Sequence, residues 1–245
     1  MNNTANQSTE LEATGERFLP DMQGTIALEH LHRYAWAKDL AAGKVVLDIA
    51  CGEGYGSALL AGTASQVYGV DMAPDAIAHA KAVYQRSNLK FLVGRCAGIP
   101  LPDGAVDLVV SFETIEHHTE HEAMFAEIKR VLRPGGLLVM SSPDKLEYTE
   151  RTNHANPYHV KELYAEEFQR LVERHFSRVA VLGQRVLYAS AILPHCLPGT
   201  AVHYYRGEDS AVQKVHGLMR PCYQVAIASN GALPSAVSSL FEQLG

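Results

Sequence analysis

Apolar runs alternate with helical patterns along this chain, as a layered α/β fold requires. Seven short runs rich in Val, Ile and Leu predict strands at 44–49, 66–71, 90–94, 106–112, 137–141, 179–182 and 223–228. Helical spacing of apolar residues occurs at 26–40, 57–61, 72–84, 122–132 and 161–176. The pattern predicts a doubly wound sheet of seven strands, preceded by one N-terminal helix.

The same pattern predicts how the chain is divided. A polar tail runs to about residue 15, and we expect residues 1–42 to form this tail and a helical lid, with 43–245 as a single domain. With 245 residues, 47% of them hydrophobic, the chain can bury the core of one large α/β domain. Residues 190–221 show no periodicity, so we expect a long loop there.

The first predicted strand ends in an acid and runs into a glycine-rich loop. Asp48 is followed at alternating positions by Ala50, Gly52, Gly54 and Gly56. Glycines allow tight turns and let a backbone lie against a ligand where a Cβ atom would collide. The second strand ends about twenty residues later in Asp71, where an acid can grip a ribose diol.

Two ligand classes use this layout. A dinucleotide fingerprint requires a third glycine where this chain has Ser57, and Asp48 would repel a pyrophosphate. A ligand with an ammonium and a sulfonium group would be attracted to Asp48. These features disfavour a nucleotide-dependent oxidoreductase and favour S-adenosylmethionine.

The loop resembles motif I of the class I SAM-dependent methyltransferases, with Ala50 in place of the usual first glycine, a change that we expect the backbone to tolerate. Residues 93–100 resemble the family's adenine loop, but Arg95 replaces its acid, so backbone atoms near Cys96 and Ala97 are expected to read the base. The turns at 102–107 and 132–136 also match. The resemblance implies a mostly parallel sheet whose last strand is antiparallel. It also implies a cofactor site made of Asp48, Ala50, Gly52, Gly54, Asp71, Met72, Cys96, Ala97 and Ser111.

Ionisable residues crowd the end of the fourth predicted strand, a position typical of active sites in open sheets. His117 is the predicted general base for an acceptor hydroxyl, oriented by Glu116 or Glu113. One alternative is that Glu116 and His117 cap the next helix. Another is a metal site, because Glu113, Glu116 and His117 resemble the E-x-x-E-H segment of small-RNA 2′-O-methyltransferases and ubiquinone-pathway enzymes, with His159 as a further ligand. From the sequence we favour a base without metal.

Residues 15–20, 29–34 and 156–163 resemble segments of methyltransferases encoded with bacterial glycan and polysaccharide assembly enzymes. Arg17 and Arg33 could hold the cofactor carboxylate or a substrate phosphate, and Tyr34 could close over the cofactor. A plain amphipathic helix over the sheet is the alternative. Without His117 as the base, His30, His32 or Tyr34 would be the next candidates.

The expected function is therefore O-methylation of a sugar hydroxyl on a glycan or nucleotide-linked sugar. The alternatives are a quinone or natural-product O-methyltransferase and a non-catalytic SAM-binding protein. The net charge of −6 disfavours a nucleic-acid partner. Without a signal-peptide pattern or a run near ~18 apolar residues, we expect no membrane span and a cytoplasmic protein. The cysteines form no zinc-binding spacing, so we expect reduced thiols at Cys51, Cys96, Cys196 and Cys222.

Overall fold

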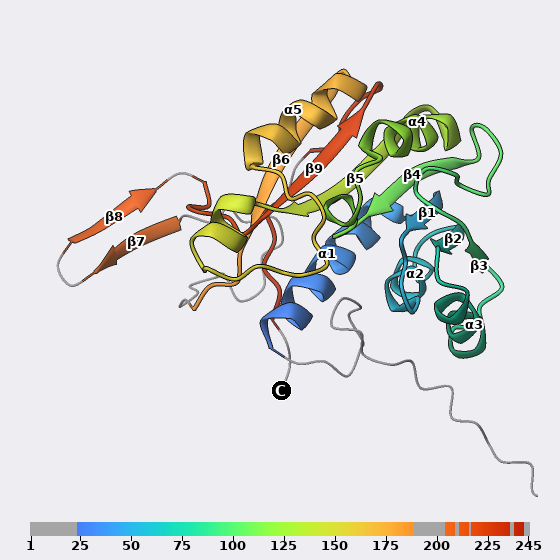
Figure 1. The fold of residues 1–245 in the computed structure, drawn as a ribbon, viewed down its shortest axis with the longest axis horizontal. Helices are drawn as coiled ribbons and strands as arrows, with labels where there is room; N and C mark the ends of the chain where they lie inside the picture. The colour runs from blue at the N-terminus through green and yellow to red at the C-terminus, as the bar shows by residue number, and fades with distance from the viewer. Residues whose placement is uncertain (1–23, 189–203, 209–210, 216, 236–237, 243–245) are drawn as a thin grey trace, which may run out of the picture.

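A mixed sheet of seven strands runs through the protein in the order β3-β2-β1-β4-β5-β9-β6 (Figure 1). The computed structural model describes residues 24–188, 204–208, 211–215, 217–235 and 238–242. The strands of the sheet are β1 (Val45–Ile49), β2 (Gln66–Asp71), β3 (Leu89–Val93), β4 (Val106–Ser111), β5 (Leu132–Pro143), β6 (Arg178–Gln184) and β9 (Tyr223–Ser229). Only β9 runs antiparallel to its neighbours β5 and β6 within this sheet, which confirms the predicted seven-stranded, mostly parallel architecture.

Helices cover both faces of the sheet, as a doubly wound fold requires (Figure 1). One face carries α1 (Thr25–Ala41), α2 (Tyr55–Leu60) and α3 (Pro74–Val83), and the other carries α4 (His121–Val131) and α5 (Ala165–His175). Successive strand residues enter opposite layers, so that Val46 packs in the first core and Leu47 in the second. None of the described helices is both long enough and apolar enough to cross a bilayer.

The N-terminal helix is part of the first layer along its C-terminal half. Ala37 and Ala41 are completely buried in the core that also contains Val46 of β1. Alanine at these positions lets the backbone of α1 approach α2 closely. The predicted helix at 26–40 is confirmed, and its N-terminal half extends toward the carboxyl ends of the strands.

Three predictions about secondary structure were wrong. A turn was expected at 132–136 and a strand at 137–141, but β5 runs from Leu132 to Pro143. The described part of 190–221 contains an antiparallel hairpin of β7 (Tyr204–Glu208) and β8 (Ala211–Val215), where we expected only loop. The segments Tyr204–Glu208 and Ala211–Val215 contain charged and polar residues and lack the continuous apolar run that marks the buried strands of the main sheet. The helix predicted from residue 161 begins at Ala165, because Tyr164 is its N-cap and the Tyr164 amide donates to Glu167 Oε2 at 3.1 Å. Leu163 instead pairs with Asp144 in an isolated parallel bridge.

The glycine loop is shaped by packing as much as by turning. A Cβ atom on Gly54 would lie 2.8 Å from Phe91 Cζ, and one on Gly56 would lie 2.1 Å from Tyr34 Cζ. These two glycines therefore admit neighbouring aromatic rings, where the sequence suggested close approach to a ligand. Ala50 has φ 61°, in the left-handed region that costs a residue with a Cβ atom about 1–2 kcal/mol. The backbone accommodates alanine here, as expected, but in a strained conformation.

Relief of this strain gives a stability prediction. Ala50→Gly is expected to raise the free energy of unfolding by up to about 1 kcal/mol, since the lost strain outweighs the greater flexibility of glycine in the unfolded chain. Ala78→Gly, on the exposed side of α3, is the matched control and should lower it by about 0.5–1 kcal/mol. Urea denaturation of both variants tests this. Equal destabilisation by both changes would contradict the strain at Ala50.

A buried carboxylate joins the first helix, the first strand and the glycine loop. The Tyr34 hydroxyl of α1 donates to Asp48 Oδ1 at 3.1 Å, and the Ser57 hydroxyl of α2 donates to Asp48 Oδ2 at 2.6 Å. Burial raises the pKa of Asp48 to about 7, although both hydroxyl donors oppose this rise. The protonated acid is thus favoured in the folded state over most of the acidic range.

The raised pKa makes stability depend on pH with a definite sign. Because Asp48 has a higher pKa in the folded state than the ordinary value of about 3.9, its contribution is full below pH ~4 and is lost as pH rises through about 7. The stability of Asp48→Asn relative to the natural protein should therefore rise between pH 4 and 8. Denaturant titrations at several pH values measure this. Asp39→Asn removes an exposed carboxylate of α1 as the control, and an identical pH response in both variants would contradict the prediction.

Candidate active site

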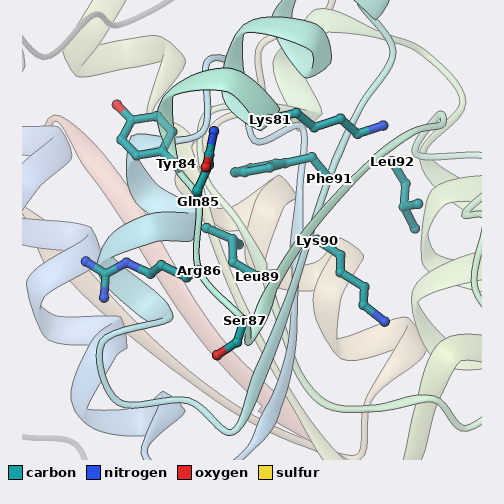
Figure 2. A pocket seen from close by; sticks show the side chains of 9 residues that line it. All are labelled: Lys81, Tyr84, Gln85, Arg86, Ser87, Leu89, Lys90, Phe91 and Leu92. Carbon is teal, nitrogen blue, oxygen red and sulfur yellow. The ribbon is translucent and has the colours of Figure 1, made fainter.

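A cavity of about 450 Å³ lies at the carboxyl ends of β1, β2 and β4. This is the edge where open parallel sheets bind ligands, next to the point at which the strand order reverses. Its walls come from the glycine loop, the ends of β2 and β4, the N-terminal half of α1 and the segment after β5. Figure 2 shows a second hollow, of about 690 Å³, beside α3 and β3. It is lined by Lys81, Arg86 and Lys90 among others and contains none of the predicted site residues. The first cavity is therefore the candidate active site.

The cofactor side of the cavity is organised around Asp71. The Gly52 amide donates to Asp71 Oδ2 and the Ala73 amide donates to Asp71 Oδ1, each at 2.9 Å. Two backbone donors fix the carboxylate at the cavity wall, and each oxygen has a further lone pair with which to accept a ligand hydroxyl. The cavity also brings together the predicted residues Ala50, Gly52, Asp71, Met72, Cys96 and Ala97.

Three predicted cofactor residues do not line the cavity. Asp48 turns toward Tyr34 and Ser57, behind the glycine loop. Gly54 packs against Phe91, and Ser111 is completely buried in the sheet. The structure therefore gives these residues supporting positions around the cavity.

The loop after β3 has the expected turn. Arg95 and Gly98 form a bridge that places Cys96 and Ala97 at the cavity wall. The Arg95 side chain is exposed and forms an ion pair with Glu120 at 3.3 Å, and both residues line the same cavity. Burial raises the pKa of Cys96 to about 12, which keeps its thiol neutral. Cys51, Cys96 and Cys222 are all free thiols, and Cys196 lies outside the described residues.

Arg33 is buried under the cavity and does not line it. Its Nη1 donates to Gln184 Oε1 at 2.9 Å and lies 3.5 Å from Glu113 Oε1, and its guanidinium stacks over the Tyr223 ring at 4.8 Å. These contacts hold Arg33 within the wall rather than where it could meet a cofactor carboxylate. Arg17, the other predicted anion-binding residue, lies outside the described part of the chain.

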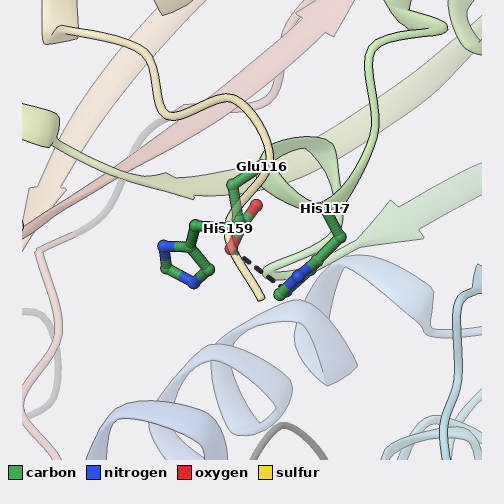
Figure 3. A group of neighbouring side chains, drawn as sticks. All are labelled: Glu116, His117 and His159. Atoms are coloured by element: carbon green, nitrogen blue, oxygen red, sulfur yellow. Dashed lines mark ion pairs between the residues drawn. The ribbon is translucent and has the colours of Figure 1, made fainter. Parts of the chain in front are cut away.

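The part of the cavity wall that follows β4 holds a group of three side chains, Glu116, His117 and His159, called here the acceptor-side cluster (Figure 3). Backbone hydrogen bonds bring its two segments together. The Glu116 carbonyl accepts the amides of Val160 at 2.8 Å and Lys161 at 2.9 Å. These bonds clamp the short helix η1 (Ile115–His117) to residues 158–161, so that His159 lies beside His117 with ring centroids 5.1 Å apart.

Glu113 is separated from this cluster although it is close in sequence. The Ser141 hydroxyl donates to Glu113 Oε1 at 2.5 Å, and Arg33 lies 3.5 Å from the same oxygen. Glu113 has φ 49°, an uncommon value for a residue with a side chain. Of the two acids predicted to orient His117, the structure brings Glu116 to the imidazole, with 3.9 Å between Glu116 Oε1 and His117 Nε2.

The helix-cap alternative was wrong. Helix α4 has Glu120 as its N-cap and no side-chain hydrogen bond to its first turn. Glu116 is completely buried, and His117 Nδ1 lies 3.2 Å from the carbonyl oxygen of Tyr158. Both residues thus lie in the cavity wall, where they can act on a ligand.

Several cavity residues had no local sequence signal. Tyr55 follows β1, Tyr148 follows β5 and Tyr223 begins β9, so these three side chains meet only in the folded protein. His30 also lines the cavity, with its Nδ1 3.1 Å from the Tyr55 hydroxyl. Burial, together with the charge of Arg33, lowers the pKa of His30 well below its ordinary value. A sequence pattern cannot report such side chains, because the sheet topology alone decides that they share a wall.

Comparisons with known proteins agree with this geometry. Residues 47–140 match the methyltransferase domain family. A probable S-adenosylmethionine-dependent methyltransferase of Mycolicibacterium smegmatis is 37% identical over 166 residues, which are 66% of this chain and 64% of the relative. Another, from Mycobacterium tuberculosis H37Rv, is 36% identical over 177 residues, 71% of this chain and 64% of the relative. The chain thus spans about two thirds of the length of these relatives.

A solved structure shows the same fold. A SAM-dependent methyltransferase from Thermotoga maritima superposes with a TM-score of 0.58 at 18% identity, over 83% of this chain and 90% of that protein. The strand order and the antiparallel β9 are those of the class I methyltransferase fold. Residues 47–140 thus match a methyltransferase domain, within a sheet that has the class I methyltransferase fold, and the two relatives are described as probable S-adenosylmethionine-dependent methyltransferases.

Proposed function

We propose that the chain transfers the methyl group of S-adenosylmethionine to a hydroxyl group of a sugar, in a glycan or a nucleotide-linked sugar. One observation carries this proposal: a single cavity joins Asp71 and the glycine loop, on the cofactor side, to Glu116, His117 and His159 on the acceptor side. Both groups that the reaction needs, a ribose-binding acid and proton-accepting side chains, face the same space.

The chemistry requires the acceptor to lose a proton. The acceptor oxygen attacks the methyl carbon, the carbon–sulfur bond breaks with its electron pair going to sulfur, and the hydroxyl proton is released. Because the Tyr158 carbonyl can only accept, His117 Nδ1 carries the hydrogen of that contact and Nε2 is the basic nitrogen. His117 Nε2 is also the nitrogen beside Glu116, so we assign proton handling to the acceptor-side cluster.

The wall near this cluster suits a sugar. The Tyr148 ring stacks on His159 at 5.4 Å and meets Tyr223 at 5.8 Å, and Asn156 lines the same wall. Aromatic faces beside an amide can contact the C–H face of a pyranose and bind its hydroxyls. The resemblance of residues 156–163 to enzymes of glycan assembly points the same way. The aromatic wall also fits a quinol, which remains the second candidate.

Removal of the predicted ribose contact tests the cofactor side. Asp71→Ala should weaken S-adenosylmethionine by about 1–3 kcal/mol, the cost of leaving polar partners unpaired. Calorimetry measures this affinity, with Asp103→Ala, an exposed carboxylate in the turn before β4, as the control. Unchanged affinity in folded Asp71→Ala, or equal binding of NAD, would show that this assignment is incorrect.

Product analysis tests the acceptor. Mass spectrometry of reactions with sugar nucleotides, glycans and quinols should reveal a gain of one methylene on a sugar hydroxyl. His117→Ala should lower kcat by about 10²–10⁴ while S-adenosylmethionine still binds. Methylation of quinols but not of sugars would favour the second candidate, a quinol O-methyltransferase. Cofactor binding without transfer to any of these acceptors would favour a non-catalytic SAM-binding protein.

A further inference from the structure

We infer that Glu116, His117 and His159 form a binding site for one divalent transition-metal ion at the acceptor end of the cavity. One donor atom from each residue lies within 4.8 Å of the other two (Figure 3). Around a tetrahedral ion with ligands at about 2.0–2.2 Å, donors lie roughly 3.4 Å apart. Small side-chain rotations would bring the three donor atoms to this separation.

The hydrogen bonds behind the two imidazoles match those of metal ligands. His159 Nδ1 lies 2.6 Å from Glu162 Oε1, and His117 Nδ1 lies 3.2 Å from the Tyr158 carbonyl. Ligating histidines nearly always donate their second nitrogen to a carboxylate or a carbonyl, which fixes the ring and raises the basicity of the ligating nitrogen. Thr149 donates to the same Glu162 oxygen at 2.7 Å and so holds the supporting carboxylate in place.

Asn156 marks the position where the ion would contact His159. Its Nδ2 lies 3.1 Å from His159 Nε2, while its Oδ1 accepts the Tyr158 amide. The amide thus satisfies Nε2 when no ion is bound and must move aside when one enters. Stacking of Tyr148 on the His159 ring keeps the imidazole in place during that exchange.

The donor set selects the class of ion. Two imidazoles and one carboxylate suit Zn²⁺, Fe²⁺ or Co²⁺, whereas Mg²⁺ prefers oxygen ligands and retains its water. The sequence suggested four ligands, but Glu113 is bound to Ser141 and Arg33, which leaves a site with three protein ligands. Such a site keeps a coordination position for a small oxygen ligand.

This position gives the ion a role that rests on the proposed function. An acceptor hydroxyl bound there would release its proton to solvent water more readily, because the positive charge of the ion would stabilise the oxyanion. The ion would then supply the activation that a metal-free His117 would otherwise provide. Metal binding itself depends only on the three side chains.

Direct titration of the full chain tests the site. Protein stripped with EDTA should bind one Zn²⁺ per chain by calorimetry, should not bind Mg²⁺ at the same concentrations, and should develop the absorption bands of protein-ligated Co²⁺. His159→Ala and Glu116→Gln should each weaken Zn²⁺ binding by more than about 100-fold, and Glu162→Gln by about 10–100-fold. His154→Ala removes an exposed imidazole from the same segment and should leave the affinity unchanged.

The outcomes separate the two proposals. Failure of the stripped natural protein to bind Zn²⁺ or Co²⁺, or equal affinities of His159→Ala and His154→Ala, would overturn the metal site. Binding of S-adenosylmethionine to the same samples is measured in parallel and reports on folding. If the natural protein binds S-adenosylmethionine but no Zn²⁺ or Co²⁺, the metal site is wrong and the proposed function is unaffected. If it binds the ion but no S-adenosylmethionine, the proposed function is wrong and the metal site is unaffected.

Discussion

The buried carboxylate of Asp48 is the interaction on which the position of the cavity depends. Its two oxygens accept hydroxyls from α1 and α2, so one side chain of β1 holds both helices against the sheet. The Tyr34 ring reaches it only because Gly56 leaves room, since a Cβ atom there would overlap the ring. The glycine loop and the N-terminal helix therefore constrain one another, and both contribute walls to the cavity.

The strands of the sheet could be predicted because buried parallel strands require continuous apolar runs. Val46, Leu47, Val109 and Val110 are all completely buried, which explains why their segments stood out. The hairpin of β7 and β8 could not be predicted in the same way, because short paired strands produce no comparable run. The strain at Ala50 was also invisible, since a sequence does not display φ angles.

The candidate site, too, could be predicted from the sequence only in part. Asp71 and the acids and histidines after β4 follow strand ends directly, so their meeting at one edge follows from the topology of parallel strands. The topology does not determine which partner each of these side chains contacts. Glu113 and Glu116 are three residues apart, yet one pairs with Ser141 and the other joins His117, because the left-handed backbone at Glu113 turns the chain between them.

The clamp between Glu116 and residues 160–161 joins two segments that are distant in sequence into one wall of the cavity. The segment after β5 is anchored at one end by the pairing of Asp144 with Leu163 and at the other by the two amides on the Glu116 carbonyl. Between these anchors lies the short helix η2 (Leu146–Glu150), whose Tyr148 stacks on the His159 ring and whose Thr149 donates to Glu162. A change in the side chains of this segment would therefore alter the shape of the cavity wall and the orientation of the His159 imidazole together.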